Sequence, residues 1–144
     1  MPLLIQIVTS FLAAAGFGIL FNAPRNALIQ CGLVGSSGWL VYYHLTNHEM
    51  DIVPATIFAA MLVSILSQLC AKWFKKPVIV FTVSGIIPLV PGGVAYNAMR
   101  HFVENDYDTA LQLSAQVMLV AGGIAIGLMF SEVIHQIRKK IKRQ

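Results

Sequence analysis

Two histidines near the middle of the chain are the nearest approach to a metal site in this sequence. His44 and His48 stand four residues apart, so a helix places them on one face, and Glu49 follows directly. The zinc-protease motif instead has its glutamate directly after the first histidine. We therefore interpret the pair as a solvated helix end and predict neither a metal nor a cofactor.

A second polar group surrounds His101 and contains three carboxylates, Glu104, Asp106 and Asp108. Charged residues this closely spaced are typical of a solvated connection. The sequence has no nucleophile elbow, no phosphate-binding loop and no pair of carboxylates inside an apolar segment. It therefore does not predict an enzyme.

A run of prolines and glycines is more informative: Pro88-Leu89-Val90-Pro91-Gly92-Gly93. Proline removes backbone donors, so a continuous helix is not expected here. A helix that starts near Gly92 or Gly93 presents free amides and a partial positive charge, which bind a carboxylate without any Lys or Arg. The alternative is a simple structural kink. Including two polar residues one turn on, the candidate substrate-binding residues are Pro88, Pro91, Gly92, Gly93, Tyr96 and Asn97.

The composition indicates where these residues lie. Of the 144 residues, 57% are hydrophobic and 11% are charged, whereas a soluble domain carries about a quarter charged residues. This excludes a soluble enzyme and a nucleic-acid-binding domain. Cys31 and Cys70 lie in apolar runs and are interpreted as small hydrophobic residues. The sequence predicts an all-α, polytopic integral membrane protein.

Five segments are candidates to cross a bilayer, which takes roughly 20 apolar residues per helix. The predicted spans are residues 3–21, 27–45, 52–71, 78–99 and 109–130. The fourth is predicted to be broken, because its uninterrupted apolar part covers only about 20 Å at 1.5 Å per residue. Extending that part to residue 99 places the proline–glycine run in mid-span. Residues 131–144 form a basic tail, and residues 1–144 are expected to be one transmembrane domain.

Charged residues alternate between the connections. Nine of the ten Lys and Arg residues follow the first, third and fifth segments, and Arg100 is the exception. The positive-inside bias then predicts a multi-pass protein with its N-terminus outside and its C-terminus in the cytoplasm. Arg25 and Arg100, at opposite predicted faces, are candidate mouth charges that attract anions. The simpler interpretation is that the two arginines only reflect the orientation of the chain in the membrane.

Small and polar residues recur at helical spacing in four of the segments. Helix backbones approach closely along such stripes, and buried Gln and Ser side chains bond across the contact. We interpret the stripes mainly as packing faces, and the alternative is a polar lining for a solute path. They are Gln6, Ser10, Ala14 and Gly18; Gly32, Gly35 and Gly38; Thr56, Ala60, Ser64 and Gln68; and Gly123, Gly127 and Ser131, which Gln112 and Gln116 extend.

Residues 80–96, with Pro-x-x-Pro-Gly-Gly inside them, resemble the signature of the threonine/serine exporter family. Residues 21–25 and 31–32 also fit. The resemblance covers nearly the whole chain and is to the smaller C-terminal half of the family, which some members encode as a separate subunit. In particular, the chain is similar to the small subunit of the two-component succinate exporter.

This resemblance implies export of small polar metabolites, threonine/serine or succinate, across the bacterial inner membrane. It also implies an obligatory larger membrane subunit that carries the other half. No ATP-binding motif is present, so an ion gradient is the expected driving force. The residues do not decide between an amino acid and a dicarboxylate. The residues slightly favour a dicarboxylate, because no acidic residue lies deep in a predicted span to pair with the ammonium group of an amino acid.

The leading hypothesis is a subunit of a secondary exporter of small carboxylate-bearing metabolites, held in the lipid bilayer. In this mechanism the proline–glycine run binds the substrate carboxylate. The alternative is a non-transporting membrane scaffold that stabilises or regulates a partner membrane protein, which the small-residue stripes suit equally well. A passive channel is not favoured, because no ring of charge or filter sequence is present.

Overall fold

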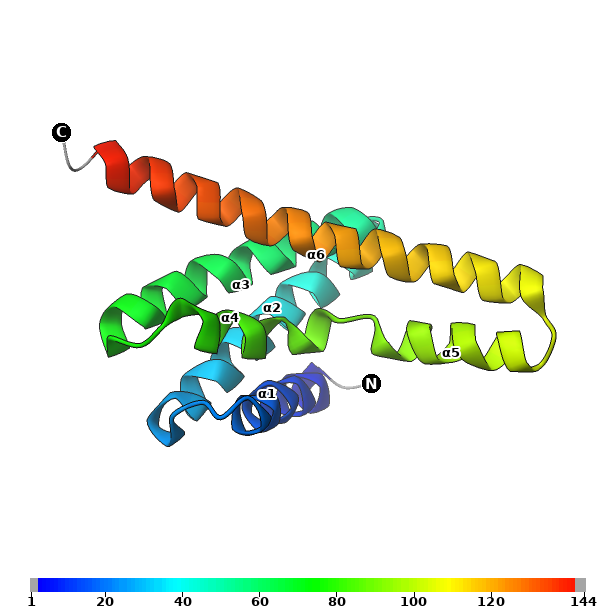
Figure 1. The fold of residues 1–144 in the computed structure, drawn as a ribbon, viewed down its shortest axis with the longest axis horizontal. Helices are drawn as coiled ribbons and strands as arrows, with labels where there is room; N and C mark the ends of the chain where they lie inside the picture. Colours follow the sequence, from blue (N-terminus) through cyan, green and yellow to red (C-terminus); the bar gives the residue numbers. More distant parts are fainter. Residues whose placement is uncertain (1–2, 142–144) are drawn as a thin grey trace.

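The computed structural model describes residues 3–141, and that part of the chain contains only helices and their connections. The α-helices are α1 (Leu3–Leu20), α2 (Leu28–Asn47), α3 (Ile52–Phe74), α4 (Val78–Ile86), α5 (Gly92–Val103) and α6 (Tyr107–Ile141). Two short 3-10 helices are η1 (Arg25–Ala27), before α2, and η2 (Ile87–Leu89), after α4. The predicted all-α fold is confirmed (Figure 1).

Each of four helices ends at a residue with left-handed backbone. Asn22, Glu49, Lys75 and Asn105 have φ between 52° and 62° and follow α1, α2, α3 and α5 within two residues. The next amide in each case donates to a carbonyl of the last helical turn, at 2.8–3.3 Å. These bonds satisfy helix-end carbonyls and reverse the chain within a few residues.

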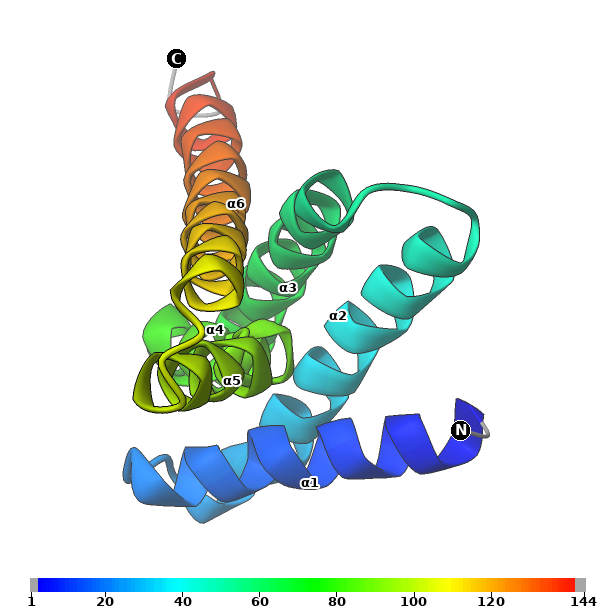
Figure 2. The same cartoon turned by 90° about the vertical axis from the view of Figure 1, so that its right-hand side faces the viewer.

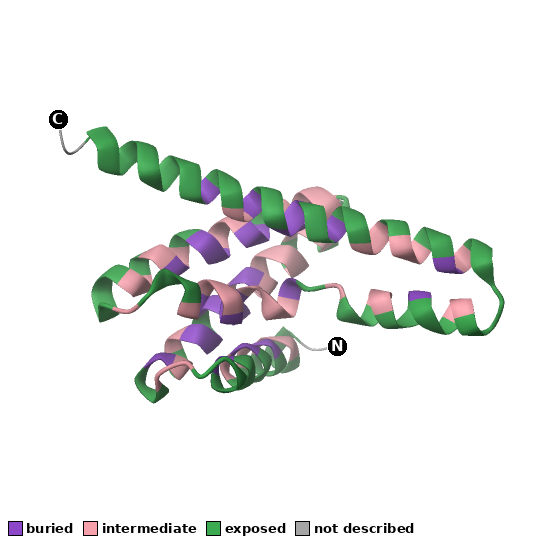
Figure 3. Cartoon of the chain, viewed as in Figure 1, coloured by how far each residue is buried: buried purple, intermediate pink, exposed green. Residues whose placement is uncertain are grey.

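The distribution of buried and exposed residues is that of a protein in lipid. The buried polar residues of the described chain are all hydroxyl-bearing: Ser10, Ser36, Thr56, Ser64, Ser67, Ser84 and Ser131. Large apolar side chains instead cover the outside, and Leu20, Val103 and Met118 are 75%, 80% and 75% exposed. Figure 3 shows that most of α6 is exposed along its length. A water-facing globule would have the opposite arrangement.

By length and composition, three helices of the described chain can cross a membrane: α1, α3 and α6. The bent pair formed by α4–η2 and α5 gives a fourth span if it is counted as one. The sequence predicted five spans, and the difference is α2, which has 20 residues but is less apolar. Its buried stretch includes three glycines and a serine.

The lower hydropathy of α2 agrees with its position in the centre of the bundle. It contacts α1, α3 and α4, so its surface is covered mainly by protein. A helix enclosed by other helices needs less apolar surface than one that faces lipid. Viewed along the long axis of the molecule, α5 lies against α6, and α1 lies apart from that pair (Figure 2).

The connections separate by charge along the long axis. The α1–α2 and α3–α4 connections and the C-terminal part of α6 lie at one end, while the α2–α3 and α5–α6 connections lie toward the other (Figure 1). The first end carries Arg25, Lys72, Lys75, Lys76, Arg138, Lys139 and Lys140. The second carries Glu49, Asp51, Glu104, Asp106 and Asp108, with Arg100. The alternation predicted along the sequence is therefore present in space.

The segment predicted as a basic tail is a continuation of α6. Helix α6 extends without interruption through Ile141, and residues 142–144 lie outside the described residues. At 1.5 Å per residue its 35 residues are about 52 Å long. That length exceeds a hydrocarbon core of about 30 Å, so part of α6 extends beyond it.

Candidate functional site

The predicted break lies between α4 and α5. Helix α4 ends at Ile86, and one 3-10 turn follows. Val90 is then extended, with φ −65° and ψ 128°, before α5 begins at Gly92. The two helical pieces meet at an angle of 52°. The prediction of a half-helix that starts near Gly92 is confirmed.

Two prolines cause this break. Pro88 and Pro91 have no amide hydrogen, so they cannot donate to the hydrogen-bond ladder of α4. The amides between and after them bond locally instead: Val90 donates to the Ile87 carbonyl at 3.2 Å, and Gly92 donates to the Val90 carbonyl at 2.8 Å. The chain therefore turns tightly before the helix resumes.

Helix α5 begins with free backbone donors. Ala95 is the first α5 residue that donates to an acceptor one helical turn back, the Pro91 carbonyl at 3.0 Å. The amides of Gly93 and Val94 precede it and have no acceptor within the helix. Pro91, at the N-cap, makes no side-chain bond to them. This helix start therefore presents two amides and a partial positive charge.

The open side of this helix start is not covered by the chain itself. A side chain at Gly92 or Gly93 would meet no atom within 4 Å. Tyr96 is 70% exposed, and Asn97 is also exposed. Pro88 and Pro91 are half-buried, and the Pro88 Cγ lies 3.4 Å from a Cβ built on Gly35 of α2. One wall of the candidate site is therefore present, and the opposite wall is open.

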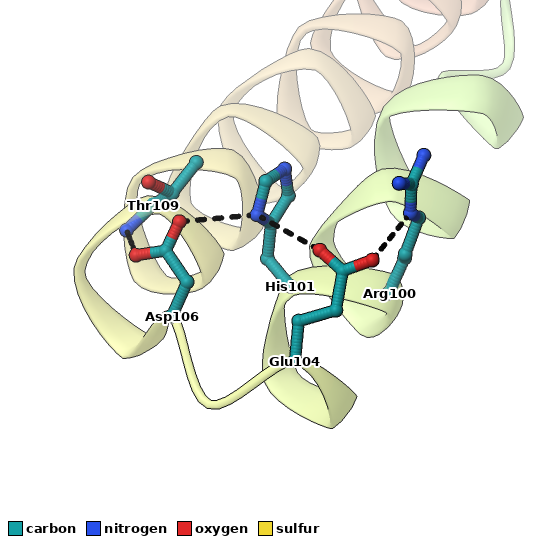
Figure 4. Close-up of polar contacts among 5 residues, drawn as sticks. All are labelled: Arg100, His101, Glu104, Asp106 and Thr109. Atoms are coloured by element: carbon teal, nitrogen blue, oxygen red, sulfur yellow. Dashed lines mark hydrogen bonds and ion pairs between the residues drawn. The ribbon is translucent and has the colours of Figure 1, made fainter.

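The two candidate mouth charges lie at opposite ends of the molecule. Arg25 is exposed at the start of η1, at the basic end. Arg100 is also exposed, but its Nε donates to Oε1 of Glu104 at 2.8 Å (Figure 4). Arg100 is therefore already paired with a carboxylate one helical turn away.

The acidic group around His101 organises the turn between α5 and α6. His101 Nδ1 lies 3.1 Å from Asp106 Oδ2 and 3.9 Å from Glu104 Oε2 (Figure 4). The Thr109 amide donates to Asp106 Oδ1 at 3.4 Å, which places Asp106 as the cap of α6. Hydrogen bonds from Thr109 lower the pKa of Asp106 below its usual range. These contacts therefore stabilise the turn between α5 and α6, in agreement with the solvated connection expected from the sequence.

The histidine pair of α2 is a local aromatic contact. The rings of His44 and His48 meet edge-on with centroids 4.5 Å apart, and both residues are exposed. Within residues 3–141, no three His, Cys, Asp or Glu side chains are grouped closely enough to hold a metal ion.

The small-residue stripes are packing faces. On α2, a Cβ built on Gly32 would lie 2.5 Å from the Phe11 ring of α1. On α6, a Cβ built on Gly127 would lie 2.5 Å from the Ile57 carbonyl oxygen of α3, and one on Gly123 would lie 3.4 Å from that of Val53. These backbones approach so closely only because no side chain separates them.

The hydrogen bonds of the stripes agree with the prediction in part. Thr56 of the α3 stripe donates to a carbonyl of its own helix at 2.7 Å, as do three buried hydroxyls outside the stripes, Ser36, Ser67 and Ser84, at 2.7–3.1 Å. A carbonyl one turn back is always within reach of a helical Ser or Thr, so these groups need no neighbour. The glutamines do bond across helices. Trp39 Nε1 donates to Gln6 Oε1 at 3.0 Å, and Gln68 Nε2 lies 3.5 Å from Ser131 Oγ.

Two open pockets, lined mainly by apolar surface with a few polar side chains, lie along the contact between α3 and α6. The larger, of about 580 Å³, lies where α3 begins and is lined by Asp51, Ile52, Val53, Pro54, Gln112, Ala115, Gln116 and Leu119. The smaller, of about 240 Å³, lies between α3, α4 and α6 and is lined by Ser64, Gln68, Val78, Ile79, Thr82, Leu128 and Glu132. Gln112 and Gln116, predicted to extend a packing stripe, therefore line a pocket.

Sequence reasoning missed Glu132, which it placed in the basic tail. In the structure its Oε2 lies 3.3 Å from Gln68 Nε2, in the smaller pocket. The available signal was its position directly after Ser131, the last residue of the α6 stripe.

Comparison with known proteins agrees with this architecture. The profile of a family described as "Threonine/Serine exporter, ThrE" matches residues 6–134. A Haemophilus influenzae protein described as uncharacterized is 29% identical over 150 aligned residues, which cover 98% of this chain and 50% of the relative. The chain thus spans about half the length of that relative. No solved structure matches the chain. The family profile covers most of the chain, which therefore belongs to the threonine/serine exporter family.

Proposed function

We propose that this chain is a subunit of a secondary membrane exporter of small carboxylate-bearing metabolites. The observation that carries the proposal is the start of α5, where two amides have no helical acceptor and the surrounding space is open. A helix N-terminus of this kind binds a carboxylate through its amides and its partial positive charge. Broken helices supply such substrate sites in secondary transporters.

A larger membrane subunit completes the site in this proposal. Two findings support it: Gly92, Gly93 and Tyr96 face open space, and the chain matches only half of its relative. Irregular backbone at membrane depth needs protein or a water-filled cavity around it. The partner supplies that surrounding, and this chain alone does not export.

The proposed setting is the bacterial inner membrane, with the N-terminus outside and the C-terminus in the cytoplasm. The gathering of basic residues at one end of the molecule supports this orientation. Threonine or serine, named by the family, and a succinate-type dicarboxylate are the two substrate candidates, because each carries a carboxylate for the start of α5.

The test is efflux from cells that contain the partner and a Gly92→Leu variant. A Cβ built on Gly92 would meet no atom of this chain within 4 Å, so the variant is expected to fold. Its leucine side chain would fill the open space next to the free amides. We expect export to be lost, with membrane insertion and partner binding unchanged. Gly122→Leu on α6 is the matched control, because Gly122 is equally open.

Normal export by Gly92→Leu would show that the start of α5 is not the substrate site. A loss of export that follows only from a lower amount of the partner would support the scaffold alternative instead.

A further inference from the structure

The pocket around Glu132 combines a carboxylate with oxygen acceptors from three helices. Glu132 comes from α6, Gln68 and Ser64 from α3, and Thr82 from α4. Ser64 is 5% exposed, and the neighbouring Ser131 is 3% exposed. Glu132 itself is exposed and Gln68 is half-buried, so the carboxylate lies at the open edge of the pocket and the buried Ser64 lies deeper.

Glu132 has no cationic partner among residues 3–141, where the only ion pairs are those of Arg100 and His101. Its carboxylate accepts hydrogen bonds from two neutral amides: Gln68 Nε2 at 3.3 Å from Oε2, and Gln136 Nε2 at 3.2 Å from Oε1. Each carboxylate oxygen has two acceptor positions, so acceptor capacity remains on both. Two amides therefore hold the carboxylate in place, and it makes no ion pair among these residues.

The unused acceptors match the donors of a primary ammonium group, which has three N–H bonds and no acceptor. Glu132 supplies a charged oxygen, and the Gln68 side-chain carbonyl supplies a neutral one. The Thr82 hydroxyl donates to the Val78 carbonyl at 3.1 Å, so its own lone pairs remain available. An anion, by contrast, would meet a carboxylate without any Lys or Arg lining the pocket.

The pocket is separate from the start of α5. Thr82 lies seven residues before the end of η2, so the two sites are on the order of 10 Å apart along the helix. The ammonium and carboxylate groups of one α-amino acid are joined through a single carbon atom and cannot reach both. The pocket lies near the basic end of the molecule, where α3 ends and α4 begins.

We infer that Glu132 and Gln68 form a loading site for the ammonium group of an amino-acid substrate, at the end of the molecule that we assign to the cytoplasm. This inference rests on the proposed exporter function and deepens it. It selects an amino acid over a dicarboxylate, the opposite of the slight preference drawn from the sequence. That preference considered only acidic residues deep in the predicted spans, whereas Glu132 is exposed near the basic end of α6.

The test is binding of labelled L-threonine to membranes that contain the full chain and its partner. N-acetyl-L-threonine, which lacks the ammonium group, and succinate are the competitors. We expect Glu132→Gln to weaken threonine binding by about tenfold, because the amide oxygen still accepts a hydrogen bond but no longer carries the charge that strengthens it. Glu132→Asp should retain part of the binding, and Asp108→Asn, which removes an exposed carboxylate of the same helix outside the pocket lining, is the matched control. Because the start of α5 is proposed to bind any carboxylate, the competition is measured in the Gly92→Leu variant, and neither competitor should displace threonine there.

Three results would overturn the inference: unchanged threonine binding by Glu132→Gln, equal displacement by N-acetyl-L-threonine, or no threonine binding by the unaltered protein. These outcomes are distinct from failure of the proposed function. That failure is read from efflux with Gly92→Leu, whereas this test reads binding, and its Glu132 variants change only the pocket on α6.

Discussion

The contact between α3 and α6 predicts that one added methyl group at Gly127 destabilises the protein. A Cβ at this position would lie 2.5 Å from the Ile57 carbonyl oxygen, 2.9 Å from the Ala60 Cβ and 3.2 Å from the Met61 amide nitrogen. Two of these atoms belong to the α3 backbone, so they move only if the helices separate. Overpacking of this kind costs about 1–3 kcal/mol.

Gly122 provides the matched comparison on the same helix. A Cβ there meets no atom within 4 Å, so Gly122→Ala gains only the better helix propensity of alanine, about 1 kcal/mol. The same gain applies to Gly127→Ala and cancels in the difference. We therefore expect Gly127→Ala to be less stable than Gly122→Ala by about 1–3 kcal/mol, the overlap cost alone.

The assay is equilibrium unfolding of the two purified variants in the same detergent micelles, with the unaltered protein as reference. Equal stabilities of Gly127→Ala and Gly122→Ala would refute the reasoning. Such a result would mean that the close α3–α6 contact does not hold the helices together.

Two further predictions concern the helix ends. Glu49 has φ 62° after α2, a conformation that costs a residue with a Cβ about 1 kcal/mol, so Glu49→Gly should raise the free energy of unfolding by about that amount. A decrease in thermal stability would contradict this assignment. The lowered pKa of Asp106 means that its carboxylate contributes stability above the ordinary aspartate pKa of about 4, and that this contribution is lost as pH falls through the lowered pKa. Asp106→Asn should therefore flatten the dependence of unfolding on pH below about 4, and an unchanged dependence would show that the cap is not formed.

The sequence could predict features that depend on local chemistry. Pro88 and Pro91 cannot donate backbone hydrogen bonds in any fold, so the break and the start of α5 at Gly92 follow directly from residue types. The spacing of Gly123 and Gly127 likewise places them on one face, which the structure shows packed against α3.

Features that depend on which helices become neighbours could not be predicted in the same way. The stripe on α3 gave no indication that Gln68 would lie opposite Glu132, because that contact joins residues 64 positions apart. Glu132 was placed in the tail since it follows the last apolar run, whereas α6 continues through it. The central position of α2, which explains its low hydropathy, is also a result of tertiary packing.

The central claim is that this chain is one part of an exporter that works only with a larger partner. The most direct measurement is efflux of labelled threonine and labelled succinate from cells that contain this chain alone, the partner alone, or both. The account predicts export only when both chains are present, with threonine as the faster label. Export by either chain alone, or export of neither label when both are stably present in the membrane, would contradict it.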